Sequence, residues 1–72
     1  MSLGTDRVRA DFNPSKNTLV DQIKRKAAEL IDLCQDIKGA PVESSERARC
    51  AALAQTYFET GAMYAVKAAT YE

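Results

Sequence analysis

The stretch LVDQIKRKAAELIDL, residues 19–33, places its apolar residues three and four positions apart. This spacing is typical of an amphipathic α-helix. On a helical wheel the apolar side chains gather in one arc of about 160°. We predict that this arc is the packing face; it contains Leu19, Val20, Ile23, Ala27, Leu30, Ile31, Leu33, Cys34 and Ile37. The opposite arc is charged, and we predict that it faces solvent; it contains Asp21, Arg25, Glu29, Asp32 and Asp36.

The residues before this stretch carry helix-start signals. Asn13 followed by Pro14 fits a cap and a first helical position, and Asn17 or Thr18 offers a second candidate cap. We therefore predict a first long helix over about residues 14–38. Residues 1–12 show no period and are predicted to form an extended arm, with no structural role assigned to the first four residues.

The residues after the stretch end one helix and start another. Gly39 fits the left-handed position that closes a helix, and Pro41 prevents its continuation. A new cap at Ser44 or Ser45 begins a second helical pattern, over about residues 44–69. The predicted fold is all-α: a short N-terminal arm or turn followed by two long antiparallel helices, a helical hairpin in a single domain of 72 residues.

Three consecutive cations in the first helix have different surroundings on the wheel. Arg25 has Asp21 four residues before it and Glu29 four residues after it, so we predict an ion-paired surface residue. Lys24 lies at the border of the apolar arc, and Lys26 falls inside it. Lys26 has two explanations: its stem lies along apolar surface while its ammonium reaches water, or its charge serves a bound anion.

The second helix is apolar or small over more than half of its circumference, which one partner helix cannot cover. A chain of 72 residues has no further layer to offer, so we expect a homo-oligomer. The remaining stripe is polar, and it either faces solvent or forms an anion site where symmetry copies converge. The stripe contains Arg49, Thr56, Thr60 and Lys67.

Composition excludes several classes of function. Ten basic and ten acidic residues cancel, which argues against DNA, RNA or an anionic membrane as partner. There is no histidine, and two cysteines cannot supply the four ligands of a structural zinc site. Cys34 and Cys50 are interpreted as buried, unpaired side chains in a reducing, cytoplasmic compartment. No residue set suits catalysis, so we predict a protein without enzymatic activity, metal or cofactor.

The stretch LVDQIKRKAAELIDL (19–33), followed by RCAALAQTYFETGAMYAVKA (49–68), resembles the phage anti-CBASS nucleotide sponges. These proteins share a helical-hairpin domain with the Thoeris anti-defence sponges. The resemblance implies a homo-oligomer, commonly a hexamer, in the cytoplasm of the host cell. It also implies sequestration, without cleavage, of cyclic dinucleotides such as 3′,3′-cyclic GMP-AMP, which blocks host CBASS signalling. Some members also bind cyclic trinucleotides at a separate site.

The resemblance also assigns candidate site residues. By position, Phe12 corresponds to the aromatic that contacts the bases, and Lys26 to the lysine that contacts the phosphates, with Lys24 as the alternative. The polar stripe defined above becomes a candidate cyclic trinucleotide site. At Gln55 the sequence departs from the basic residue that is frequent in the family. The alternative function is a structural or regulatory hairpin whose apolar second helix binds a protein partner.

Overall fold

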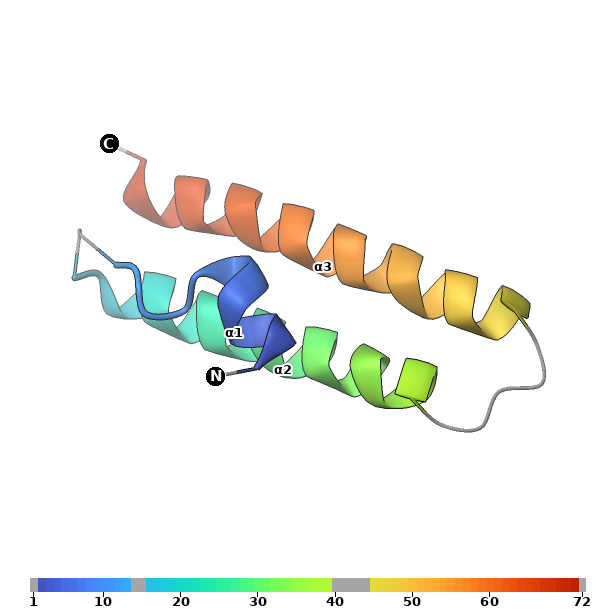
Figure 1. Ribbon diagram of the computed structural model, residues 1–72. Helices are drawn as coiled ribbons and strands as arrows, with labels where there is room; N and C mark the ends of the chain where they lie inside the picture. The colour runs from blue at the N-terminus through green and yellow to red at the C-terminus, as the bar shows by residue number, and fades with distance from the viewer. Residues whose placement is uncertain (1, 14–15, 40–44, 72) are drawn as a thin grey trace.

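The computed structural model describes residues 2–13, 16–39 and 45–71. Within these residues it contains three helices: α1 (Leu3–Val8), α2 (Thr18–Gly39) and α3 (Ser45–Thr70). The long helices α2 and α3 run antiparallel along their length, and the short α1 packs mainly on α2 (Figure 1). The predicted all-α helical hairpin is therefore confirmed.

The N-terminal segment is a docked helix, and the prediction of an extended arm was wrong. The Ser2 hydroxyl accepts a hydrogen bond from the Thr5 N–H, and the Thr5 hydroxyl accepts one from the Ser2 N–H, which together form a capping box. The Gly4 N–H donates to Oδ1 of Asp32 on α2 over 2.7 Å. Asp32 therefore anchors α1 and is not the freely solvated side chain that the wheel predicted. A helix of six residues is too short to show a period.

The first long helix begins at the second of the two predicted caps. The Asn17 side chain accepts a hydrogen bond from the Leu19 N–H over 2.8 Å and donates one to the carbonyl of Ala69 over 3.1 Å. The cap therefore also ties the start of α2 to the end of α3. The predicted start near residue 14 was too early, and Pro14 itself lies outside the described residues. Gly39 is the last residue of α2, whereas Pro41 and Ser44 lie outside the described residues.

Only part of the predicted packing face of α2 is buried. Val20, Ala27, Ile31 and Cys34 are buried, together with Ala28 and Lys24. The other part of the arc is open: Leu19 is 56% exposed, Leu30 42%, Leu33 60% and Ile37 40%. We call these four residues the α2 apolar stripe. The wheel found the apolar arc, but the positions of α1 and α3 decide which part of it is covered.

The core of the hairpin is narrow because small residues line it. Its buried members are Val8, Ala10, Ala27, Ala28, Ile31 and Ala62, with Ile23 and Phe58 packed against them. Gln55 is also buried, and its Nε2 donates to the carbonyl of Ile31 (3.0 Å) and to Oε1 of Gln35 (3.2 Å). Lys38 donates to Oε1 of Gln55 over 3.3 Å. These hydrogen bonds satisfy the buried amide, which would otherwise destabilise the core.

The molecule is elongated, with extents of 47 × 21 × 12 Å. Its radius of gyration is 13.4 Å, compared with about 11 Å for a compact chain of this length. Its accessible surface is 5185 Å², compared with about 4,400 Å² for a compact monomer of this mass. The two long helices therefore leave an unusually large surface open, and the α2 apolar stripe is part of it.

Candidate functional site

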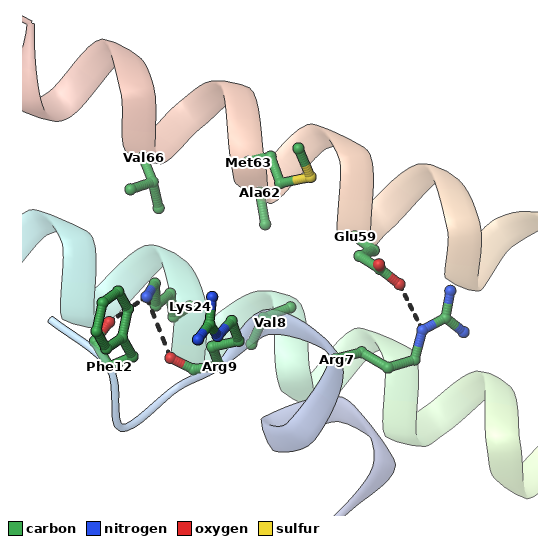
Figure 2. A pocket seen from close by; sticks show the side chains of 9 residues that line it. All are labelled: Arg7, Val8, Arg9, Phe12, Lys24, Glu59, Ala62, Met63 and Val66. Atoms are coloured by element: carbon green, nitrogen blue, oxygen red, sulfur yellow. Dashed lines mark hydrogen bonds and ion pairs between the residues drawn. The ribbon is translucent and has the colours of Figure 1, made fainter.

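A pocket of about 410 Å³ opens between the N-terminal segment and α3 (Figure 2). This volume lies within the roughly 300–1,000 Å³ that is typical of small-molecule sites. All three helices contribute to its lining, which consists of Arg7, Val8, Arg9, Phe12, Lys24, Glu59, Ala62, Met63 and Val66. The pocket combines apolar walls from α3 with charged groups from α1, the segment after it and α2.

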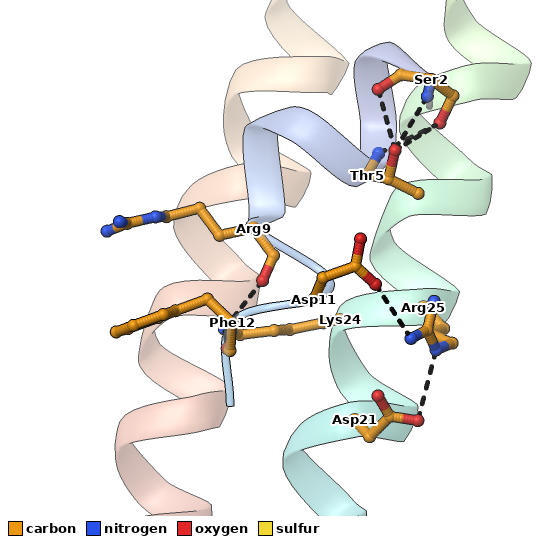
Figure 3. Close-up of polar contacts among 8 residues, drawn as sticks. All are labelled: Ser2, Thr5, Arg9, Asp11, Phe12, Asp21, Lys24 and Arg25. Carbon is orange, nitrogen blue, oxygen red and sulfur yellow. Dashed lines mark hydrogen bonds and ion pairs between the residues drawn. The ribbon is translucent and has the colours of Figure 1, made fainter. Parts of the chain in front are cut away.

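Lys24 joins α2 to the segment that follows α1, at one side of this pocket. Its side chain is 8% exposed, and its Nζ donates hydrogen bonds to the carbonyl of Arg9 over 3.1 Å and to the carbonyl of Phe12. Arg9 ends α1 in the left-handed conformation, with φ at 55°, and the resulting turn directs both carbonyls toward α2 (Figure 3). An ammonium carries three N–H donors. These two carbonyls use two donors, and one donor remains for an acceptor in the pocket.

Phe12 presents an aromatic ring beside two cations. The side chain is 52% exposed. The Cζ atom of Arg9 lies 4.7 Å from the centre of the ring, and Nζ of Lys24 lies 5.4 Å from it. Both distances are within the range of cation–π attraction. The ring is therefore fixed near positive charge while part of its surface stays open.

The charges that line the pocket do not balance. Arg7 donates to Oε1 of Glu59 across the pocket over 2.5 Å, and this ion pair joins α1 to α3. Arg9 and Lys24 make no ion pair among the described residues. Three cations face one carboxylate, so the pocket carries an excess of two positive charges. This excess, next to an aromatic ring and apolar walls, suits an anionic ligand that has flat apolar parts.

The fold and the sequence pattern agree with a known family. The sequence matches the family model described as Acb2/Tad1, hairpin domain, over residues 4–70. The chain belongs to the Acb2/Tad1 hairpin family. Proteins of this family are anti-defence nucleotide sponges and are generally binders without catalytic activity. Searches of curated proteins and of solved structures gave no match.

This Acb2/Tad1 hairpin brings together two of the three predicted dinucleotide-site residues. Phe12 and Lys24 line the same pocket, whereas Lys26 is exposed and lies outside it. The wheel placed Lys26 inside the packing face and Lys24 at its border, and both placements were wrong. The reason is that α1 and the segment after it cover the side of α2 that carries Lys24. Lys26 instead projects from the same side of α2 as the exposed Leu30 and Leu33.

Arg9 and the ion pair between Arg7 and Glu59 were missed in the sequence. The available signal was the charge of the N-terminal third, where residues 1–26 hold six cations and three acids. No periodicity linked that charge to a pocket, because the lining residues come from segments about 50 positions apart. Arg25, by contrast, pairs with Asp21 as predicted and also with Asp11, and its hydrogen bond to Asp21 raises the pKa of its guanidinium.

The polar stripe of the second helix is exposed on α3. Arg49, Thr56, Thr60 and Lys67 are all on the surface, and none of them lines the pocket. Arg49 donates both Nε and Nη2 to the carboxylate of Glu46. This hydrogen bonding lowers the pKa of Glu46 and raises the pKa of Arg49, so the pair stays charged near neutral pH. An anion that binds Arg49 must therefore compete with Glu46.

The cysteine prediction was half right. Both thiols are free, and Cys34 is buried, but Cys50 is exposed on α3. Among the described residues, no cluster of three or more His, Cys, Asp or Glu side chains is placed to hold a metal ion. In the same part of the chain, no helix has both the length and the apolar character needed to cross a bilayer.

Proposed function

We propose that this protein binds and sequesters cyclic oligonucleotide second messengers, cyclic dinucleotides first, and so blocks host CBASS signalling without cleaving the ligand. The observation that carries this proposal is the excess of two positive charges in a pocket that also presents Phe12. A cyclic dinucleotide has two phosphates and two flat bases. Its charge matches the excess, and its bases match the ring and the apolar side chains of Met63 and Val66.

The energetics favour a pocket completed by a second copy of the chain. Stacking of a base on an aromatic side chain contributes about 1–3 kcal/mol. Sequestration of a signal needs nanomolar affinity, which corresponds to about −12 kcal/mol. One ring and two unpaired cations fall well short of this value. A neighbouring copy that packs over the pocket adds further cationic and apolar contacts to the same ligand.

The α2 apolar stripe supports such an assembly. Four large apolar side chains on one face of a small protein are typical of an interaction surface. The extended shape and the excess of accessible surface favour the same conclusion. Lys26 projects from this face, so in the proposed homo-oligomer, which we expect to be a hexamer, the face of one copy carries Lys26 to the pocket of its neighbour.

The direct test of the function is isothermal titration calorimetry of the whole protein with 3′,3′-cyclic GMP-AMP. We expect saturable binding at about nanomolar Kd, with the nucleotide recovered intact by chromatography afterwards. A panel of other cyclic di- and trinucleotides ranks the ligands. If no member of the panel gives heat or a thermal shift, the proposed function is wrong; if the nucleotide is recovered as a cleaved product, the protein is an enzyme.

Replacement of Lys26 by alanine tests the contribution from the neighbouring copy. We expect Lys26→Ala to weaken dinucleotide binding at least about tenfold, equivalent to roughly 1.4 kcal/mol, and to leave the melting temperature almost unchanged because the four apolar side chains of the α2 apolar stripe remain. Calorimetry and thermal denaturation measure the two effects. Unchanged affinity would transfer the role of Lys26 to Lys24.

A charge in the α2 apolar stripe tests the proposed assembly. The wild-type protein is expected to be an oligomer in size-exclusion chromatography with light scattering, and Leu33→Asp to be smaller, because a buried carboxylate at an apolar interface is strongly unfavourable. Leu33→Met keeps the apolar surface and serves as the control. A wild-type monomer would instead favour the alternative function, a hairpin that uses its exposed apolar surface to bind a protein partner.

We also propose the exposed stripe of Arg49, Thr56, Thr60 and Lys67 as the cyclic trinucleotide site. What supports it is the alignment of two cations and two hydroxyls on one face of α3, outside the lining of the pocket. A trinucleotide phosphate that binds Arg49 would have to replace its ion pair with Glu46. The trinucleotides in the calorimetric panel address this site separately from the pocket.

A further inference from the structure

Arg9 occupies an unusual place at the mouth of the pocket. It lines the pocket beside Lys24, and it also lines a second, more open hollow together with Asp6 and Asp11. Its guanidinium lies over the ring of Phe12, with Cζ 4.7 Å from the ring centre (Figure 3). A base that stacks on this part of the ring must therefore displace the guanidinium.

Arg9 also makes fewer polar contacts than the other two cations that line the pocket. Arg7 is held by Glu59, and Lys24 is held by two carbonyls. Among the described residues, the side chain of Arg9 has neither an ion pair nor a hydrogen bond, and it lies against the ring of Phe12. Because the residue is exposed, its long side chain can change rotamer without crossing packed atoms. Of the three cations, Arg9 can move at the lowest cost.

The backbone at Arg9 supports a role for its side chain. With φ at 55°, the residue adopts the left-handed conformation, and its N–H donates to the carbonyl of Asp6 to close α1. Glycine adopts this conformation without the steric cost that a side chain brings. Fold stability alone therefore favours glycine at this position. At Arg9 this conformation accompanies a side chain that lies over the ring of Phe12, whereas Lys16, with the same φ, lies outside the pocket.

We infer that Arg9 exchanges partners when the nucleotide binds, an inference that rests on the proposed function. In the free protein the guanidinium covers the ring of Phe12. In the complex a base takes its place on the ring, and the guanidinium turns to a phosphate, whose oxygens match its planar fork of N–H donors. One side-chain movement thus exposes the ring of Phe12 for stacking and brings the guanidinium to the phosphate. Nucleotides are therefore favoured over nucleosides, which lack the phosphate.

The first experiment compares Arg9→Gly with Lys16→Gly by calorimetry with 3′,3′-cyclic GMP-AMP. Lys16 is a matched control because it is an exposed cation with the same φ of 55° and lies outside the pocket. We expect Arg9→Gly to bind at least about tenfold more weakly than Lys16→Gly, although both should melt at or slightly above the wild-type temperature because glycine adopts the left-handed conformation readily. Arg9→Lys, which keeps the charge but loses the fork, should fall between them.

The second experiment needs no nucleotide. The chain has no tryptophan, so Phe12→Trp introduces a single reporter at the ring position. We expect the ratio of iodide quenching to acrylamide quenching to fall when Arg9→Gly is added, because iodide is concentrated by the nearby guanidinium and acrylamide is neutral. Adding Lys16→Gly instead should leave the ratio unchanged.

The outcomes separate the two proposals. If the wild-type protein binds and Arg9→Gly binds as tightly as Lys16→Gly, the inference is overturned and the proposed function stands. If the quenching ratio does not respond to Arg9→Gly, the guanidinium does not cover the ring and the exchange is overturned. If the wild-type protein binds no cyclic nucleotide, the proposed function fails and this inference fails with it.

Discussion

Gly4→Ala is expected to release α1 from α2 and to destabilise the protein by about 3 kcal/mol, because overpacking against a rigid neighbour costs roughly this much. A Cβ atom at Gly4 would lie 2.7 Å from the carbonyl carbon and 2.8 Å from the Cα of Ala28, and closer still to its carbonyl oxygen. These are backbone atoms inside α2, so they cannot move aside. The substitution also pulls the Gly4 N–H away from Asp32.

Thermal denaturation at fixed protein concentration measures this effect. A loss of about 3 kcal/mol lowers the melting temperature by roughly 12–24 °C in a domain of this size. If only α1 detaches, amide hydrogen exchange in residues 5–10 should accelerate while α2 and α3 stay protected. A melting temperature within about 2 °C of the wild type, together with unchanged exchange, would contradict the close approach of the two helices.

Gly61→Ala is the matched control for this substitution. Gly61 lies inside α3, and a Cβ atom there would have no neighbour within 4 Å. Alanine should therefore stabilise the helix by about 0.5–1 kcal/mol, since it has the higher helix propensity and loses less backbone entropy on folding. The same change from glycine to alanine is thus expected to have opposite signs at the two positions.

The second large effect is expected from Lys24→Met, which keeps the length and apolar character of the stem but removes the ammonium. The carbonyls of Arg9 and Phe12 then lose their buried donor. Leaving such acceptors unpaired costs about 1–3 kcal/mol. We expect the melting temperature to fall by roughly 5–20 °C, and dinucleotide affinity to fall at least about tenfold, because the segment that carries Phe12 loses its tether.

Arg25→Met removes the same charge from the neighbouring position. Arg25 is exposed and pairs with Asp21 and Asp11 on the surface, so its loss should change stability and binding little. Calorimetry and thermal denaturation of the two variants, measured side by side, separate the effect of losing the hydrogen bonds of Lys24 from the effect of losing one positive charge. Equal behaviour of Lys24→Met and Arg25→Met would show that the hydrogen bonds of Lys24 do not hold the segment.

The sequence identified residues of the candidate site better than it predicted their arrangement in space. Phe12 and Lys24 were both selected, and the structure places them in one pocket. The wheel misjudged which of the two lysines is buried, because it treats the helix as an isolated cylinder and the apolar arc of α2 is wider than its two neighbours cover. Arg9 could not be selected, since its position over Phe12 depends on a left-handed turn that no local pattern indicates.

The sequence by itself determined the two long helices and the antiparallel hairpin, and it offered Asn17 as one of several candidate caps. These features depend on interactions between residues a few positions apart, which a linear pattern records. Tertiary structure alone decided that Lys24 is buried, that Lys26 is exposed, and that Gly4 must lack a side chain. Each of these depends on where α1 packs on α2. That placement is set by contacts between segments more than 20 positions apart, such as the hydrogen bond from Gly4 to Asp32.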